Sequence, residues 1–425
     1  MKKHEMKLDN ESILKSINND YIHRNKKLNK LMEIINSLDE NAVIAIDGSW
    51  GSGKTVFVKQ LLFLNKKENV EKLNKRTQIN NSFVNEFQNK YICHYYNAWE
   101  YDFHTSPLLS LIYNIIESNP GFKKQTLNGK MKLPVNIFDF LQTATAGLFD
   151  RDYVKSYEDL YKEISSLEET KKSLNNLVDK IVPKNKKLLL VIDEIDRCKP
   201  SYAVDLLEII KHFFDNDKIV FILSTNNKEL SNVIKNYYGN DFDGYGYLNK
   251  FYDLIITLNE IAPTSYLSNV LKVEYSDCYY ITVLFAVVDY FKLSMRQLNR
   301  IMSDFELLEK YFRTIHGGVH ANNIMIKYIF LPYCLGLKLT SRNDLNDFIN
   351  GTGLDKLLNY IDKIYVIKKI ILEEYFKTKT ASIEEINKKV ISEYEKYFVI
   401  NPANTMCQAF FDALSLLGGY SEITK

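Results

Sequence analysis

The sequence of 425 residues predicts an α/β fold, a parallel sheet covered by helices, followed by an all-helical C-terminal domain. Five short runs rich in β-branched or aromatic residues alternate with segments that carry apolar residues at helical spacing. The runs are apolar almost throughout, which is typical of strands buried on both faces. Beyond residue 262 the pattern is helical, with polar loops.

The elements follow from these patterns in chain order. Up to the second strand we expect helix over 10–38, strand over 41–47, helix over 56–64, helix and loop over 65–89, and strand over 90–100. Up to the third strand we expect helix over 105–119, an irregular insertion over 120–155, charged helix over 156–182 and strand over 186–194. After it we expect helix over 202–215, strand over 218–226, helix and a Gly/Tyr-rich loop over 227–250, and strand over 251–258.

Three parts of the chain are predicted from this order. Residues 1–40 form an N-terminal helical segment, residues 41–262 form the core with an insertion over about 103–185, and residues 263–425 form a helical lid or partner-binding domain. The balance of 55 Lys and Arg against 53 Asp and Glu gives a net charge of +2. This argues mildly against a protein that coats nucleic acid, and leaves a local basic patch open.

Cysteine usage and hydropathy indicate the compartment. The five cysteines lie far apart without a Cys-x-x-Cys pair, which argues against a zinc site and fits a reducing cytosol. The start, MKKHEMKLDNES, lacks the apolar core of a signal peptide. The apolar runs 278–288 and 328–337 are shorter than the ~20 residues of a membrane span. We therefore expect two buried helices there, and a cytoplasmic protein without a membrane part.

The segment GSWGSGKT at 48–55 fits the phosphate-loop pattern G-x-x-x-x-G-K-[ST], with a strand before it and a helix after it. Glycines let backbone N–H groups turn inward around phosphate oxygens. Lys54 is expected to bridge the β- and γ-phosphates and Thr55 to ligate Mg²⁺. Trp50 either covers the nucleotide or packs on the sheet edge. The expected nucleotide-binding residues are Gly48, Ser49, Trp50, Gly51, Ser52, Gly53, Lys54, Thr55 and Val56.

An acidic cluster, VIDEIDR at 191–197, ends the third predicted strand. Beside a phosphate loop, Asp193 is expected to hold the metal, and Glu194 to polarise the attacking water. Asp196 and Arg197 either pair with each other and shape the loop, or Arg197 reaches the γ-phosphate of a neighbouring subunit as an arginine finger. The alternative for Asp193 and Glu194 is a solvated strand end.

Polar residues also end the second and fourth strands. Asn226, or Thr225 before it, is expected beside the γ-phosphate, where it would sense that group; the alternative is a plain turn. Asn97, Trp99 and Glu100 lie at the nucleotide side of such a sheet. Trp99 is expected in the core, and Glu100 could orient water or bind Arg197.

Four segments together resemble the KAP family of P-loop NTPases. They are NAWEYD at 97–102, IDEIDRCKP at 192–200, YLNKFYDLIITL at 247–258 and SMRQLNR at 294–300. The phosphate loop is common to many families, whereas Asn-Ala-Trp combined with Asp-x-x-Asp-Arg is much more specific. The resemblance implies an ASCE-type core with an extra strand between the phosphate-loop strand and the acidic strand. It also implies ATP hydrolysis and, in bacteria, a link to phage exclusion and similar conflict systems.

The resemblance extends to the helical region and has limits. Arg296 matches the family's arginine in the helical lid, which implies contact with the γ-phosphate; Arg300 could do the same, and an exposed helix arginine is the alternative. Many members carry transmembrane segments between the phosphate loop and the acidic strand. Residues 101–187 hold no apolar stretch of that length, so a soluble form is expected. Glu194 stands where an aspartate is frequent in the family.

Three functions stay open from the sequence. The first is a Mg²⁺-dependent ATPase that powers or gates a bacterial anti-phage defence system. The second is an ATP-binding switch or scaffold with little turnover that regulates a partner effector. The third is a nucleic-acid-stimulated motor, for which the Lys-rich stretches 66–76 and 183–187 are the candidates. Because finger residues often act across an interface, we expect a homo-oligomer with a protein effector or partner subunit.

Overall fold

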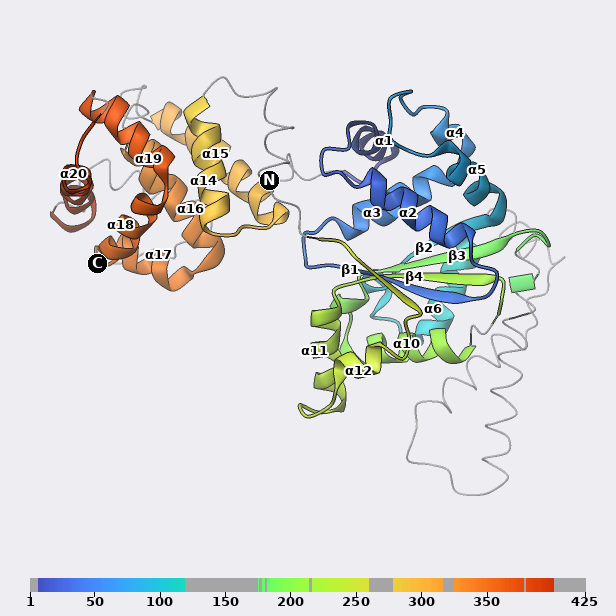
Figure 1. Cartoon of the computed structure of the whole chain (residues 1–425). Coiled ribbons are helices and arrows are strands. Elements are labelled where there is room, and N and C mark those ends of the chain that lie inside the picture. The colour runs from blue at the N-terminus through green and yellow to red at the C-terminus, as the bar shows by residue number, and fades with distance from the viewer. Residues whose placement is uncertain are drawn as a thin grey trace. The chain divides into compact units, whose positions relative to one another are not determined.

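A computed structural model of the chain describes residues 7–118, 182–213, 216–259, 278–315, 325–377 and 380–400, together with Asn175, Val178 and Asp179. It divides into two compact units, Lys7–Glu260 and Ile261–Lys425 (Figure 1). The N-terminal helices belong to the first unit. The expected insertion over 120–155 lies outside the described residues, as does most of the helix expected over 156–182.

The first unit is built on a five-stranded sheet with the order β2-β3-β4-β1-β5. All four neighbouring pairs are parallel. Strand β4 lies between the phosphate-loop strand and the acidic strand, so the expected ASCE-type arrangement is confirmed. The strands are β1 (Ala42–Asp47), β2 (Tyr91–Asn97), β3 (Lys187–Asp193), β4 (Ile219–Thr225) and β5 (Leu254–Thr257).

Helices cover both faces of this sheet, as Figure 1 shows. One face carries α1 (Asn10–Asn19), α2 (Asn25–Asn36), α3 (Lys54–Leu64), α4 (Lys67–Val70) and α5 (Asn81–Lys90). The other carries α6 (Pro107–Glu117), α10 (Pro200–Phe213), α11 (Asn227–Tyr238) and α12 (Gly244–Leu248). Under the second set lies a core of strand and helix side chains that includes Tyr96, Leu190, Ile192, Phe221, Leu111, Leu207 and Leu230. These two layers confirm the predicted α/β class.

Several boundaries differ from those expected. The helix expected over 10–38 is two helices, because Asp20 adopts a left-handed conformation (φ 43°) and its Oδ1 accepts hydrogen bonds from Arg24 N and Asn25 N. Strand β2 ends at Asn97, and Trp99–Tyr101 form a 3₁₀ turn, η1. Helix α12 forms inside the stretch expected as a loop, where the Asp243 side chain accepts a hydrogen bond from Gly246 N.

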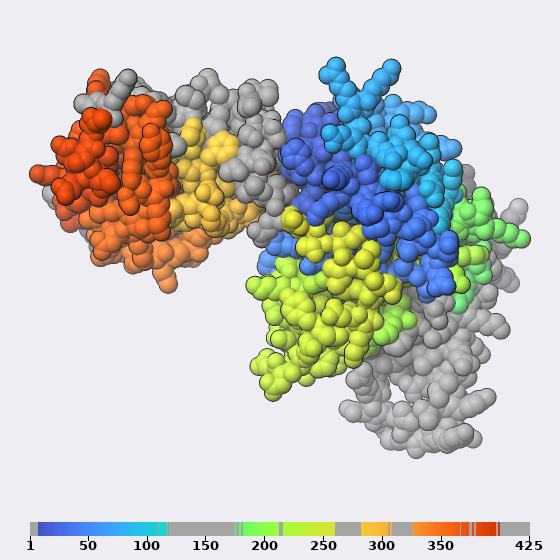
Figure 2. Space-filling view, viewed as in Figure 1, coloured from blue at the N-terminus to red at the C-terminus, as the bar shows by residue number. Residues whose placement is uncertain are grey.

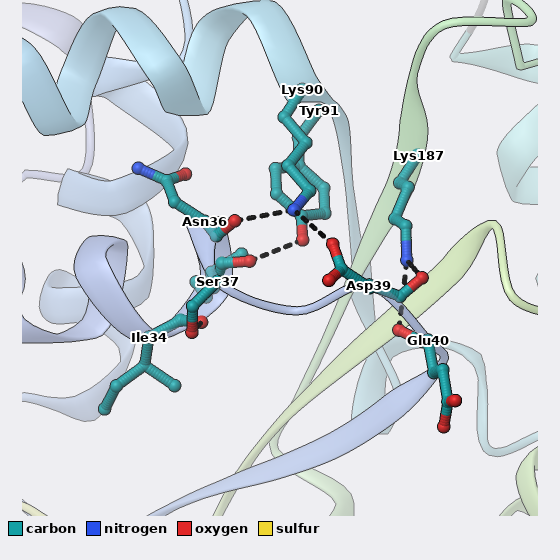
Figure 3. A network of polar contacts seen from close by, with 9 residues as sticks. Ile34, Asn36, Ser37, Asp39, Glu40, Lys90, Tyr91 and Lys187 are labelled. Atoms are coloured by element: carbon teal, nitrogen blue, oxygen red, sulfur yellow. Dashed lines mark hydrogen bonds and ion pairs between the residues drawn. The ribbon is translucent and has the colours of Figure 1, made fainter.

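The amino-terminal edge of the sheet is held by the network drawn in Figure 3. Lys90 Nζ donates to Asn36 O at 2.5 Å, and Tyr91 Oη donates to Ile35 O at 2.7 Å. From β3, Lys187 Nζ donates to Asp39 O and, at 3.1 Å, to Glu40 O. The chain between α2 and β1 is thereby fixed to β2 and β3, so β1 delivers the phosphate loop at the opposite edge.

The second unit is helical throughout its described residues. Its elements are α14 (Cys278–Tyr290), α15 (Met295–Ile315), η4 (Ile326–Phe330), α16 (Leu331–Thr340), α17 (Arg342–Ile349), α18 (Leu354–Lys363), α19 (Tyr365–Ile370), η5 (Ile371–Phe376), α20 (Ile383–Glu395) and η6 (Lys396–Ile400). Aromatic rings, among them Phe330 and Tyr333, are buried in its core. Within the described ranges no helix is long and apolar enough to cross a membrane.

Candidate functional site

The phosphate loop joins β1 to α3 at the carboxyl edge of the sheet. Gly51 and Gly53 have φ of 86° and 85°, a left-handed conformation that other residues adopt only at a cost. A Cβ atom on Gly48 would lie 2.6 Å from Ser52 Oγ and 3.1 Å from Leu258 O. The glycines of the sequence pattern are therefore required by the tight course of the loop.

Lys54, the first residue of α3, points back into the loop. Its Nζ donates to Gly48 O at 2.6 Å and to Ser49 O at 3.2 Å, and the residue is 8% exposed. Burial lowers the pKa of its ammonium group, while the nearby carboxylates, Asp196 first among them, oppose that shift. A cation held by two carbonyl oxygens gains a stronger partner when it turns to a phosphate group.

Asp193 ends β3 and is buried. Its Oδ1 accepts a hydrogen bond from Glu194 N at 2.9 Å, and its Oδ2 accepts one from Tyr95 Oη at 3.1 Å. Glu194 has φ 61° and ψ 25°, a left-handed conformation that is rare for a residue with a side chain. This turn starts η2 (Ile195–Arg197). Backbone strain of this kind is found preferentially at functional sites.

The charged residues of η2 pair differently from the expectation. Arg197 Nη1 lies 2.9 Å from Glu194 Oε1, and its guanidinium stands 5.4 Å from the centre of the Trp99 ring. Asp196 Oδ2 accepts a hydrogen bond from Trp50 Nε1 at 2.7 Å. The alternative in which Asp196 and Arg197 pair with each other is therefore wrong, because Arg197 pairs with Glu194 and Asp196 bonds to Trp50.

Both tryptophans lie at the surface of the site. Trp99 is 51% exposed, so the expectation of a core position is wrong; the 3₁₀ turn η1 brings it out beside Arg197. Trp50 is 48% exposed and its Nε1 bonds to Asp196, while its expected role of covering the nucleotide stays a prediction. That bond connects the phosphate loop to the turn that follows the acidic strand. Glu100 is exposed.

Asn226 follows β4 and caps α11. Its Oδ1 accepts a hydrogen bond from Glu229 N at 3.4 Å, so the group that it can offer to a phosphate oxygen is Nδ2. Its neighbour Asn227 was not singled out from the sequence. Asn227 N donates to Asp47 Oδ1 at 2.9 Å, and its Oδ1 accepts from Thr225 Oγ1 at 2.6 Å. Asn227 thereby fixes the ends of β1 and β4 side by side.

Three buried side-chain atoms of the phosphate loop and the neighbouring strand ends make no hydrogen bond: Ser52 Oγ, Asn97 Oδ1 and Ser224 Oγ. Strand register places Asn97 and Ser224 directly beside Asp193 on either side. Buried polar atoms rarely stay unpaired, so this gathering indicates a polar ligand at the edge of the sheet. The hydroxyl of Thr55 and the carboxylate of Asp193 supply oxygen ligands of the kind that Mg²⁺ binds, so the residues present fit the metal.

Arg24 is a second residue that sequence patterns did not reveal. It is 5% exposed, and its Nη2 donates to Ser52 O at 3.3 Å and to Asn259 O at 2.6 Å. Lys27, one turn on, donates to Thr257 O at 2.7 Å. These contacts place the start of α2 beside the end of β5, and the two chain segments lie side by side on the surface in Figure 2. Arg24 thus fastens the phosphate loop to the residues after β5.

Arg296 lies near the start of α15 in the helical unit and is exposed there, as is Arg300. Because the two units are described separately, the contact of Arg296 with a γ-phosphate stays a prediction. The other candidate residues, from the phosphate loop to Asn226, belong to the first unit.

A glycine-rich loop between a strand and a helix, a lysine at the first helical residue and a buried aspartate at the end of a non-adjacent strand define a P-loop NTPase domain. The profile of the KAP family P-loop domain matches residues 24–312, which is more than half of the 425 residues. The chain belongs to this family, and the resemblance seen in the sequence is confirmed. No curated protein matches the chain.

Proposed function

We propose that the chain hydrolyses ATP with Mg²⁺ at the carboxyl edge of its sheet. The observation that carries this proposal is a buried Asp193 between two buried, unpaired polar atoms, Asn97 Oδ1 and Ser224 Oγ, beside a phosphate loop that holds Lys54. A plain turn or a solvated strand end would not bury Asp193 among unpaired polar groups.

Each residue has a role in this proposal. Lys54 leaves the carbonyl groups of Gly48 and Ser49 and donates to phosphate oxygens, which the loop amides also bind. Thr55 and Asp193 would hold Mg²⁺, which when bound would neutralise charge on the phosphate oxygens. Glu194 accepts a hydrogen bond from the attacking water and orients it.

Breaking the ion pair of Glu194 and Arg197 would make Oε1 of Glu194 available to a water molecule. Opening it releases the Arg197 guanidinium in the same event. A cation so released would be available to the γ-phosphate, either of its own site or of a second copy, as an arginine finger requires. The proposal therefore includes a homo-oligomer as the active form, with Arg197 and Arg296 as the residues to test across the interface.

The biological setting proposed is a bacterial anti-phage defence system, in which turnover powers or gates a protein effector. Family membership supports this setting, and the helical unit is the surface proposed for the partner. A switch with little turnover is the second candidate, favoured by the Glu194–Arg197 pair, in which Arg197 occupies one oxygen of the proposed base. The described basic residues give no observation in favour of a nucleic-acid motor.

The test is ATP turnover per chain against protein concentration, with and without EDTA. The proposal predicts turnover that EDTA abolishes, that Lys54→Ala abolishes, and that rises per chain with concentration in the wild type. Binding of ATP with no turnover at any concentration would favour the switch. Turnover that survives in Lys54→Ala would place the activity elsewhere.

A further inference from the structure

Tyr95 contacts the carboxylate proposed to hold the metal, and no motif marks it. Strand register pairs Asn97 of β2 with Asp193 of β3. Tyr95 precedes Asn97 by two residues, so both side chains stand on the same face of the sheet. From there Tyr95 Oη donates to Asp193 Oδ2 at 3.1 Å.

The second oxygen of this carboxylate is also held, since Oδ1 accepts from Glu194 N at 2.9 Å. Two donors on two oxygens fix the rotation of a carboxyl group, whereas one donor leaves it able to turn. Each oxygen keeps a further lone pair for another ligand. The carboxylate is thus oriented without being saturated.

The tyrosine ring is itself held in place by α3. Lys59 Nζ stands 3.0 Å from the centre of the Tyr95 ring, in the geometry of a cation–π contact. Lys59 lies one helical turn after Thr55, so both side chains belong to the same face of α3. One face of α3 therefore carries both Thr55, whose hydroxyl is the proposed metal ligand, and Lys59, whose ammonium group contacts the Tyr95 ring.

We propose that Tyr95 is a positioning residue of the Mg²⁺ site: its hydroxyl, pinned by Lys59, sets the orientation in which Asp193 meets the metal. This inference rests on the proposed function of the site. Groups that orient a metal ligand typically change metal affinity by about 10- to 100-fold when removed. The purely structural alternative is a tyrosine that only fills space under α3 and satisfies its own hydroxyl.

The substitution Tyr95→Phe removes the hydroxyl and keeps the ring. Tyr96→Phe is a matched control, because Tyr96 lies on the opposite face of the same strand and its hydroxyl contacts Ser110 Oγ at 2.8 Å and Tyr202 Oη at 2.6 Å. A second variant, Lys59→Met, keeps the Tyr95 hydroxyl and removes the cation that pins the ring.

The experiment titrates Mn²⁺, as a substitute for Mg²⁺, into the full-length protein saturated with ADP and follows bound metal by electron paramagnetic resonance. We expect the Mn²⁺ Kd to rise at least tenfold in Tyr95→Phe and two- to fivefold in Lys59→Met, and to change less than twofold in Tyr96→Phe. ADP affinity in EDTA should match the wild type in all three.

A Mn²⁺ Kd within twofold of the wild type in both Tyr95→Phe and Lys59→Met would overturn the positioning role. Equal losses in Tyr95→Phe and Tyr96→Phe would also overturn it, because they would indicate general loosening of β2. A wild type that binds neither ADP nor Mn²⁺ would instead refute the proposed function, so the two failures are distinguishable.

Discussion

Replacing Arg24 with methionine removes a buried cation and keeps much of its apolar stem. The guanidinium donates to Asn259 O at 2.6 Å and to Ser52 O at 3.3 Å. A hydrogen bond from a charged donor contributes about 1.5–3 kcal/mol to stability, and the second bond is long. Counting one full hydrogen bond and part of another, we expect Arg24→Met to lower the free energy of unfolding by about 2–4 kcal/mol.

Lys27→Met is the matched control, because Lys27 also donates to the segment after β5, to Thr257 O and Asn259 Oδ1, but at the exposed surface. Lys27→Met should lower the free energy of unfolding by less than about 1 kcal/mol. In a unit of this size 1 kcal/mol corresponds to about 2–4 °C, so calorimetry should show Tm falling by about 4–16 °C for Arg24→Met. The Tm of the control should change by less than about 4 °C.

The functional consequence follows from the same contact. Ser52 belongs to the phosphate loop, so Arg24→Met should also weaken ADP binding, while Lys27→Met should leave it unchanged. Equal Tm shifts in the two variants, or an Arg24→Met protein as stable as the wild type, would contradict the role assigned to the buried guanidinium.

Two further predictions concern buried groups. Burial raises the pKa of the Cys198 and Cys334 thiols, so alkylation at pH 8 should reach them only after unfolding. The unfolded chain releases these protons at lower pH than the native state, so the two thiols lower the free energy of unfolding above about pH 9. Rapid labelling of Cys198 or Cys334 in the native protein would contradict this prediction. In the helical unit, Lys338 Nζ lies 2.8 Å from Asp304 Oδ2, and both side chains are buried. Lys338→Met leaves the Asp304 carboxylate buried without this cation, so the free energy of unfolding should fall by about 3–5 kcal/mol, as measured by thermal unfolding. A second substitution, Asp304→Leu, should restore most of that loss.

The sheet and the phosphate loop could be predicted because their signals are local. Each strand is an apolar run of four to seven residues, and the glycines, Lys54 and Thr55 lie within eight consecutive positions. The break at Asp20 was missed because apolar spacing continues through it, while one carboxylate competes for the backbone amides that would have extended the helix.

The contacts that shape the site are long-range, and that is why the sequence did not reveal them. Trp50 and its partner Asp196 are 146 positions apart, Tyr95 and Asp193 are 98 apart, and Arg24 reaches over 28 positions to Ser52. Periodicities of 2 and 3.6 residues describe one element at a time. The alternation along β2 did carry one usable signal, since Tyr95 shares a face with Asn97.

In the proposed function, Glu194 activates water for ATP hydrolysis while other residues bind the nucleotide. The most direct test compares ATP affinity and single-turnover hydrolysis in the wild type, Glu194→Gln and Lys54→Ala. We predict that Glu194→Gln binds ATP as the wild type does and hydrolyses it at least about 100-fold more slowly. Lys54→Ala should lose both binding and hydrolysis. Hydrolysis by Glu194→Gln at the wild-type rate would contradict the account.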